Sequence, residues 1–234
     1  MDATIASNLK SVRSRIDAAA RRAGRDPSPI RLIAVSKTFD AEHVRAAWQA
    51  GQRDFGENKV QEALQKIGET ADMEIRWHLI GHLQSNKVRK AVAAFGCIQS
   101  VDSVGLLRKL DAAAGELGVS PDVLVQVDLA REETKFGAAA DDARRIVDEA
   151  HAVKAIRLVG LMLIPPWHED QEQTRPWFKR LCELRAGWLA EGVPPACLTH
   201  LSMGMSHDFE AAIEEGATLV RVGTAIFGKR TYSS

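Results

Sequence analysis

Apolar positions along this chain follow two different periods, and segments of the two kinds alternate. Near the N-terminus, apolar residues recur at intervals of three or four, as on one face of an amphipathic helix: Ile5, Leu9, Val12, Ile16 and Ala19. After a break at Gly24 and the prolines that follow it, residues 30–36 (IRLIAVS) form a short apolar run rich in β-branched residues. That run predicts a buried strand.

Further runs of this kind give a series of expected strands: residues 30–36, 53–55, 75–80, 97–101, 123–129, 158–163, 198–202 and 219–222. Segments with helical periodicity separate them. One helix is expected between Asp40, as its N-cap, and Gly51. Others are expected at residues 58–67, 85–94, 106–117, 141–151, 177–188 and 206–215, the last of them capped by Ser206. Strict alternation of strands and helices indicates a parallel sheet.

Eight such units in roughly 200 residues are enough to close a (β/α)8 barrel. We therefore expect a single α/β domain of the TIM-barrel class over residues 1–234, with an extra helix before the first strand. An open, doubly wound sheet is the alternative, and it would normally carry a glycine-rich turn after the first strand. Residues 36–38 (SKT) contain no glycine, which favours the barrel.

The charge and cysteine content of the chain narrow the classes of protein to which it could belong. The 31 basic residues balance the 31 acidic ones, so no overall field attracts nucleic acid or an anionic membrane. No run reaches the ~18 apolar residues of a membrane span, and the start lacks the apolar core of a signal peptide. Cys97, Cys182 and Cys197 are far apart and form no C-x-x-C pair, which indicates neither a disulfide framework nor a zinc site. We expect a cytoplasmic protein.

Lys37 is the first candidate for chemistry, because it ends an otherwise apolar strand. Surroundings of low dielectric constant depress the pKa of a lysine, and the neutral amine can then form a Schiff base with an aldehyde. Taken alone, a lysine at the end of a strand is more often a solvated or ion-paired surface residue.

Two turns near the C-terminus are candidates for binding an anion: residues 201–208 (LSMGMSHD) and 221–225 (RVGTA). Backbone N–H groups at such turns favour a phosphate, and barrels commonly bind phosphate after strands seven and eight. The alternative is that Gly204 and Gly223 only permit tight turns. Together with Lys37, the two turns suggest an aldehyde that bears a phosphate, such as pyridoxal phosphate. Class I aldolases fit the same description.

Five blocks of sequence, in order, span almost the whole chain: residues 34–37 (AVSK), 55–58 (FGEN), 77–87 (WHLIGHLQSNK), 202–208 (SMGMSHD) and 221–228 (RVGTAIFG). These blocks resemble those of the pyridoxal phosphate homeostasis protein family. The resemblance implies a barrel related to the N-terminal domain of bacterial alanine racemases and a role in vitamin B6 homeostasis. It also implies pyridoxal 5′-phosphate as the cofactor, held as an aldimine on Lys37.

The same resemblance assigns roles to further residues. Arg221 would face the pyridine nitrogen, and Asn58 and His82 would line the cofactor cavity. The residues around the phosphate would be Ser202, Met203, Gly204, Gly223 and Thr224. For His82, a histidine bonded to the backbone at a helix entry is the alternative. An arginine offers only donors, so Arg221 favours an unprotonated ring nitrogen and weakens the cofactor as an electron sink.

These assignments favour a carrier of pyridoxal phosphate over an enzyme. We expect a monomer, with apo-enzymes that need the cofactor as recipients. The second hypothesis is an amino-acid racemase, which needs a base on each face of the substrate Cα, commonly a lysine and a tyrosine from a second domain. The sequence holds one tyrosine, Tyr232. Lys135, in a charged loop, is a further candidate for loading or releasing the cofactor. A class I aldolase ranks third, because no additional set of lysines and carboxylates is evident.

Overall fold

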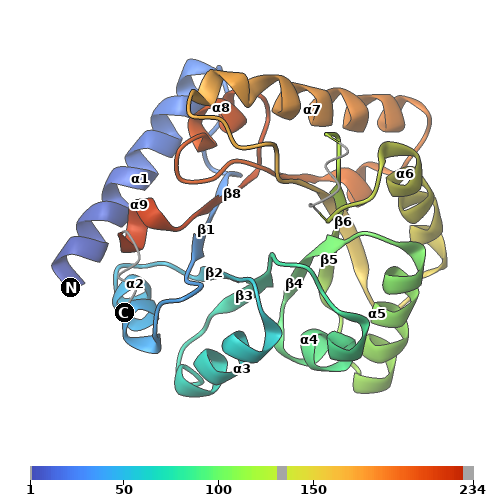
Figure 1. Cartoon of the computed structure of the whole chain (residues 1–234), viewed down its shortest axis with the longest axis horizontal. Helices are drawn as coiled ribbons and strands as arrows, with labels where there is room; N and C mark the ends of the chain where they lie inside the picture. Colours follow the sequence, from blue (N-terminus) through green and yellow to red (C-terminus); the bar gives the residue numbers. More distant parts are fainter. Residues whose placement is uncertain (1, 131–135, 229–234) are drawn as a thin grey trace.

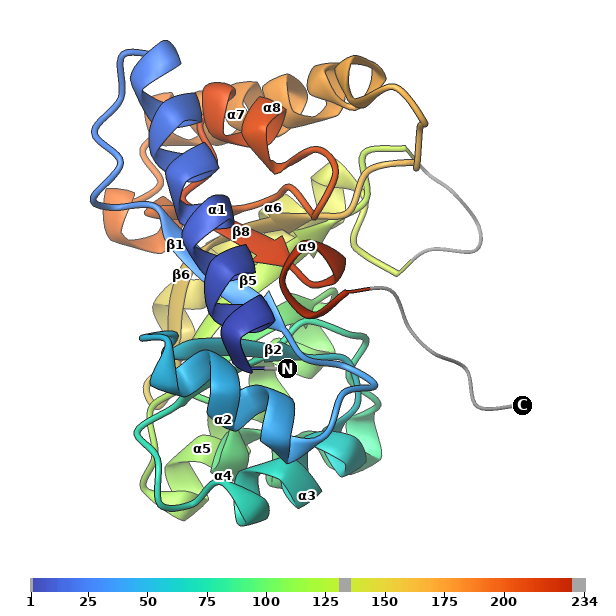
Figure 2. The ribbon, with the colours of Figure 1, turned by 90° about the vertical axis from the view of Figure 1, so that its left-hand side faces the viewer.

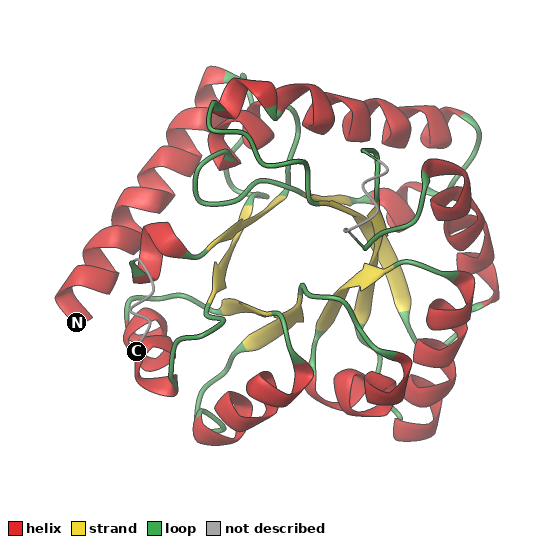
Figure 3. Ribbon diagram, in the orientation of Figure 1, coloured by secondary structure: helices red, strands yellow, loops and turns green. Residues whose placement is uncertain are grey.

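The computed structural model describes residues 2–130 and 136–228 of the chain, so Lys135 and Tyr232 lie outside the described residues. Parallel strands pair with one another in chain order, and β8 pairs with β1, which closes the sheet into a barrel (Figure 1). Helices surround this ring of strands on the outside (Figure 3). The predicted (β/α)8 barrel with an extra N-terminal helix is confirmed.

The strands are short and mostly buried. They are β1 Arg31–Val35, β2 Asp54–Glu57, β3 Arg76–Leu79, β4 Cys97–Val101, β5 Asp122–Val127, β6 Arg157–Leu163, β7 His200–Ser202 and β8 Leu219–Val222. The ranges predicted for β4 and β8 agree to the residue, and the others agree within two residues at each end. Apolar runs therefore located every strand of the barrel.

The helices of the described ranges follow the predicted order, with one short helix added at the end. They are α1 Asp2–Arg22, α2 Ala41–Gln49, α3 Val60–Glu69, α4 Val88–Ala94, α5 Val104–Leu117, α6 Ala140–Glu149, α7 Arg175–Ala190, α8 Phe209–Glu214 and α9 Thr224–Phe227. Asp40 caps α2 as predicted, since its carboxylate accepts a hydrogen bond from the backbone N–H of His43 at 3.1 Å. None of these helices combines the length and apolar character of a membrane span.

Helix α8 begins later than predicted. Its N-cap is Asp208, so the prediction that Ser206 caps this helix is wrong. The Ser206 hydroxyl instead accepts hydrogen bonds from the backbone N–H groups of Gly223 at 3.1 Å and Ala225 at 3.4 Å. These partners belong to the turn after β8, which spacing along the chain could not reveal.

Side chains of the strands separate into two layers because neighbouring residues of a strand point to opposite faces. A small apolar cluster fills the barrel interior: Ile33, Cys97, Leu124, Met162 and Leu219. A much larger cluster lies between the strands and the helices, and Phe55, Leu79 and Phe178 are among its fully buried members. The outer layer therefore provides most of the hydrophobic core.

Helix α1 lies along the outside of the barrel near β1, as Figure 2 shows, and contacts α2, α8 and α9. The apolar face predicted for it is buried. On its polar side, the Asn8 side-chain amide donates to the Ile226 carbonyl at 2.8 Å, and Arg15 pairs with Glu210 at 2.7 Å. The extra helix thus supports the two short helices that follow β7 and β8.

Alanine at Gly160 and at Gly187 tests how closely the strands pack, because the two substitutions should change the free energy of unfolding in opposite directions. A Cβ on Gly160 of β6 would lie 2.1 Å from the His200 carbonyl oxygen of β7. We expect Gly160→Ala to lower the free energy of unfolding by at least about 2 kcal/mol, through forced separation of the strands. Gly187 is exposed inside α7 with no atom within 4 Å of such a Cβ.

The matched variant Gly187→Ala should raise the free energy of unfolding by about 0.5–1 kcal/mol, because glycine is the weaker helix former. Urea unfolding at equilibrium measures both values. Equal stability of Gly160→Ala and the unchanged protein would contradict the close strand contact.

Candidate functional site

A cavity of about 510 Å³ opens at the carboxyl ends of the strands. Its walls come from the ends of β1, β2, β3, β6, β7 and β8 and from the loops that follow them. The lining residues are Val35, Lys37, Phe39, Asn58, Ile80, Ile164, Trp167, Glu169, Met205, Ser206, His207, Arg221, Gly223 and Thr224. Enzymes with this fold place their active sites at this end of the barrel.

Lys37 lies just past the end of β1, and its side chain reaches the cavity because the alternation of the strand continues over Ser36. Val35 and Lys37 line the cavity, whereas the hydroxyl of Ser36 bonds to Glu57 at 2.7 Å on the side of the sheet that faces the helices. A turn follows, closed by a hydrogen bond from the Phe39 N–H to the Ser36 carbonyl at 3.0 Å. Thr38 has a φ of +70° in this turn. For a β-branched residue that conformation costs about 1–3 kcal/mol, and such strain is concentrated at functional sites.

Arg221 also faces the cavity from its strand, β8, and its side chain is held in one place. Its Nη1 donates to the Ser202 hydroxyl at 2.7 Å, and its Nη2 donates to the Leu163 carbonyl at 2.8 Å. Burial lowers the pKa of Arg221 to about 10, and the carboxylate of Asp208 opposes this change. The guanidinium therefore stays protonated at neutral pH and offers the cavity a fixed cation.

A chain of buried hydrogen bonds continues from Ser202 through the barrel interior. The Ser202 hydroxyl donates to the Gln99 side-chain carbonyl at 2.6 Å, and the Gln99 amide donates to Nδ1 of His78 at 3.1 Å. The other ring nitrogen of His78 donates to Asp54 at 2.8 Å. Burial lowers the pKa of His78, although its hydrogen bond to Asp54 acts in the opposite direction. A neutral His78 satisfies every bond of the chain, which fixes the direction of the Ser202 hydroxyl.

The turns after β7 and β8 meet at one side of the cavity. Ser206 joins them through its bonds to the N–H groups of Gly223 and Ala225. A Cβ on Gly223 would lie 3.2 Å from the Val35 carbonyl oxygen, so the turn lies close to β1. Small residues and the Ser206 hydroxyl, whose oxygen accepts from two backbone N–H groups, thus line the wall near Lys37.

The structure brings together some of the residues proposed for cofactor binding and separates others. Lys37, Asn58, Arg221, Gly223 and Thr224 all line the cavity. Ser202 and Met203 are fully buried and outside its lining, and Gly204 packs against Phe209 and Ala212 of α8. His82 also lies outside the lining. Its ring stacks on Phe136 with a centroid distance of 3.8 Å, and its Nδ1 is 3.4 Å from Asp102.

Several lining residues were not among the predicted site residues. Ser206 is one of them, since its position in the sequence predicts a helix cap, and Trp167, which is 70% exposed, is another. Ile80 ends the third predicted strand, and strand ends on this face of a barrel are a usable signal. His207 follows Ser206 and donates to the His168 carbonyl at 3.1 Å, a contact between two loops that the sequence could not show.

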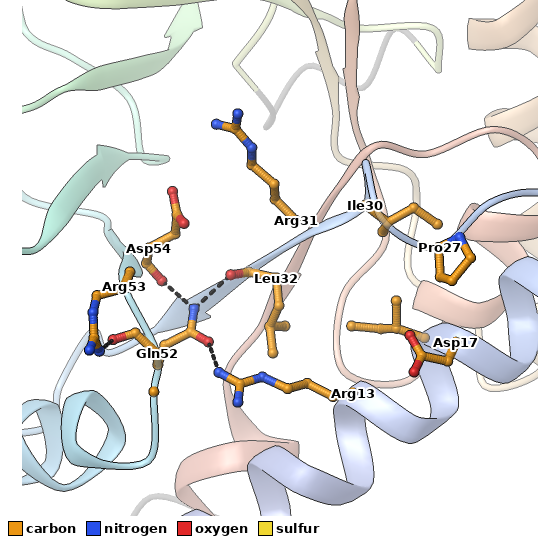
Figure 4. A pocket seen from close by; sticks show the side chains of 11 residues that line it. Arg13, Asp17, Pro27, Ile30, Arg31, Leu32, Gln52, Arg53 and Asp54 are labelled. Atoms are coloured by element: carbon orange, nitrogen blue, oxygen red, sulfur yellow. Dashed lines mark hydrogen bonds between the residues drawn. The ribbon is translucent and has the colours of Figure 1, made fainter.

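A second cavity, of about 360 Å³, lies at the opposite ends of β1 and β2, against α1 (Figure 4). Gln52 is its central polar group. The Gln52 amide donates to the carbonyls of Leu32 at 2.7 Å and Asp54 at 2.8 Å, and its carbonyl accepts from Arg13 at 3.1 Å. Its lining contains no lysine, so it offers no amine to an aldehyde. These bonds join α1 to the barrel.

Within residues 2–130 and 136–228, no group of three or more histidine, cysteine, aspartate or glutamate side chains could hold a metal ion.

Comparison with known proteins places this architecture in a family. The family model for the alanine racemase N-terminal domain matches residues 7–231. Two relatives named pyridoxal phosphate homeostasis protein are similar over nearly their whole length. The one from Pseudomonas aeruginosa is 44% identical over 232 residues, covering 99% of this chain and 98% of the relative. The one from Aquifex aeolicus is 41% identical over 224 residues, covering 96% and 97%.

Solved structures of similar proteins point to the same family. PipY of Synechococcus elongatus, solved with PLP bound, is 43% identical, with a TM-score of 0.85 over 96% of this chain and 100% of PipY. An alanine racemase from Clostridium difficile shares the fold at 16% identity, with a TM-score of 0.71 over 98% of this chain and 58% of the racemase. The chain therefore belongs to the alanine racemase N-terminal domain family and, within it, to the pyridoxal phosphate homeostasis proteins.

Proposed function

We propose that this protein binds pyridoxal 5′-phosphate through Lys37 and carries it as part of vitamin B6 homeostasis, without turning over a substrate. The observation that carries the proposal is the meeting of three groups in one cavity: the primary amine of Lys37, the fixed guanidinium of Arg221 and the two turns that carry Ser206 and Gly223. Relatives named for pyridoxal phosphate homeostasis support it, as does the PipY structure with PLP bound.

The groups in the cavity fit the chemistry of this cofactor. When bound, pyridoxal phosphate supplies an aldehyde whose carbon gains a C=N bond to an amine nitrogen and releases its oxygen as water. Lys37 supplies the amine. The turns that carry Ser206 and Gly223 would hold the phosphate, with the Ser206 hydroxyl as a donor, because its oxygen accepts from the Gly223 N–H and its own proton is left to donate. Thr224 lies at the cavity wall, and the buried Met203 and Gly204 support the turn after β7. Asn58 would add a polar contact from the end of β2.

Arg221 supports a carrier rather than an enzyme. Its two hydrogen bonds, to Ser202 and to the Leu163 carbonyl, hold a protonated guanidinium where the resemblance places the pyridine nitrogen. Because a guanidinium accepts no hydrogen bond, it favours an unprotonated ring nitrogen and gives little support to carbanion chemistry. Ser202, in this proposal, serves the cofactor by orienting Arg221.

The racemase hypothesis remains second. It requires a second base opposite Lys37 and closure of the site against water. In the described lining, the other titratable side chains besides Arg221 are Glu169 and His207, both on loops at the cavity. His207 donates through Nε2 to the His168 carbonyl, which occupies that nitrogen. The fold likeness to alanine racemase shows the architecture alone.

The setting proposed for the protein is the cytoplasm, where its three cysteines, all free thiols, would stay reduced. We propose that it acts as a monomeric barrel over residues 1–234 and that apo-enzymes are the recipients of the cofactor. His82, stacked on Phe136, would stand at the rim of the cavity. Lys135 keeps its proposed role in loading or releasing the cofactor.

Lys37→Ala should abolish covalent attachment of pyridoxal phosphate while leaving weaker, non-covalent binding through the phosphate turns. Borohydride reduction of the loaded protein, followed by peptide mapping, should place the pyridoxyl group on Lys37. Lys59→Ala is the matched control, since Lys59 is 73% exposed and paired with Glu62 at the surface. A dominant adduct on Lys59 or Lys135 would show that Lys37 is not the residue that binds the aldehyde.

The loaded protein should not exchange the α-proton of amino acids faster than free pyridoxal phosphate does, because Arg221 disfavours a protonated ring. The measurement is NMR of a panel of L- and D-amino acids in deuterated water, with Lys37→Ala as the control. Exchange at an enzyme-like rate that disappears in Lys37→Ala would replace the carrier by a racemase.

A further inference from the structure

A buried ion pair lies behind Lys37, on the side of the sheet that faces α3. Lys66 of α3 and Glu57 at the end of β2 are 2.7 Å apart, and their side chains are 9% and 0% exposed. Taking a lysine and a glutamate out of water costs free energy, and the attraction between the two charges often does not offset that cost. Such a pair therefore points to a role in placing nearby groups.

Both partners of this pair bond to Ser36, the residue before Lys37. Lys66 Nζ donates to the Ser36 carbonyl at 2.7 Å, and the Ser36 hydroxyl donates to Glu57 Oε1 at 2.7 Å. The same carbonyl accepts the Phe39 N–H at 3.0 Å, and the Ser36 N–H donates to the Gly56 carbonyl at 3.1 Å. The carbonyl of the peptide group that joins Ser36 to Lys37 thus accepts two hydrogen bonds, and the N–H and hydroxyl of Ser36 are also bonded.

The turn held in this way is a strained one. Residues 36–39 form a four-residue turn whose third residue has a positive φ, and in such turns that position normally belongs to glycine. Here it belongs to Thr38, at φ +70°. A β-branched residue keeps this conformation only where its surroundings impose it. The bonds from Lys66 and Glu57 to Ser36 supply that constraint.

We propose that Lys66 and Glu57 are positioning residues that hold the strained 36–39 turn and so keep the Lys37 amine directed into the cavity. Neither residue lines the cavity, so neither contacts its ligand. Both act through Ser36, Lys66 on its carbonyl and Glu57 on its hydroxyl. The inference rests on the proposed function only for the identity of the aldehyde that reacts with Lys37. The role of the ion pair in holding the turn does not depend on it.

The test is the double variant Lys66→Met with Glu57→Gln, which removes both charges and so leaves no unpaired buried ion. Lys59→Met with Glu62→Gln is the matched control, because it removes a surface pair of the same residue types at 73% and 40% exposure. The first readout needs no cofactor: hydrogen exchange of the Phe39 N–H, which closes the turn. It should accelerate in the double variant and not in the control.

The second readout separates positioning from general support of the cavity. Covalent attachment of pyridoxal phosphate at Lys37 should slow by about tenfold to a hundredfold, as expected for a displaced reacting group. The affinity for pyridoxine 5′-phosphate, which has the phosphate but no aldehyde, should stay unchanged. Adding Thr38→Gly should restore much of the lost rate, because glycine adopts a positive φ without strain.

Three results would overturn the proposal: unchanged Phe39 exchange, unchanged attachment, or equal losses of attachment and of pyridoxine 5′-phosphate affinity, which would mean only a structural role. Should the double variant fail to fold, Ser36→Ala, which removes one bond of the set, should give the same pattern at smaller size. If the wild-type protein attaches no pyridoxal phosphate at Lys37, the proposed function is wrong. Phe39 exchange still decides whether the ion pair holds the turn.

Discussion

The period of two along β1 is the constraint on which the site depends. In a closed barrel each strand residue must face either the interior or the helices, and the register with β2 and β8 leaves β1 no freedom to shift. That rule sends Val35 toward the cavity and the next residue, Ser36, toward the helix layer, and the turn of residues 36–39 brings Lys37 back to the cavity side. The Lys37 amine and the bonds that hold the neighbouring Ser36 therefore lie on opposite sides of the sheet.

A second constraint is the polar chain through the barrel interior. Barrel interiors are usually filled by apolar side chains, yet here Asp54, His78, Gln99, Ser202 and Arg221 are linked end to end by hydrogen bonds. If Arg221 turned away, the Ser202 hydroxyl and the Leu163 carbonyl would each lose a bonded donor inside the barrel, which is costly for buried groups. The residue that would limit the chemistry of the proposed cofactor is thus held by the core of the fold.

The sequence predicts the order of strands and helices well, because a buried strand needs an unbroken apolar run and these runs are separated by helical periods. It also locates Lys37, Arg221 and Gly223, which stand at strand ends. It does not predict which partner a polar side chain takes. Ser206 has the composition of a helix cap and instead bonds to the turn after β8. Ser202, proposed for the phosphate, has its hydroxyl engaged by Gln99 and Arg221, residues far away in the sequence.

The central claim is that Lys37, the two turns and Arg221 act together on one ligand. A crystal structure of the protein with pyridoxal 5′-phosphate tests it most directly. The account predicts continuous density from Lys37 Nζ to the cofactor, with the phosphate between the turns that carry Ser206 and Gly223 and with Arg221 beside the ring nitrogen. Cofactor bound in the cavity around Gln52, or attached to a lysine other than Lys37, would contradict it.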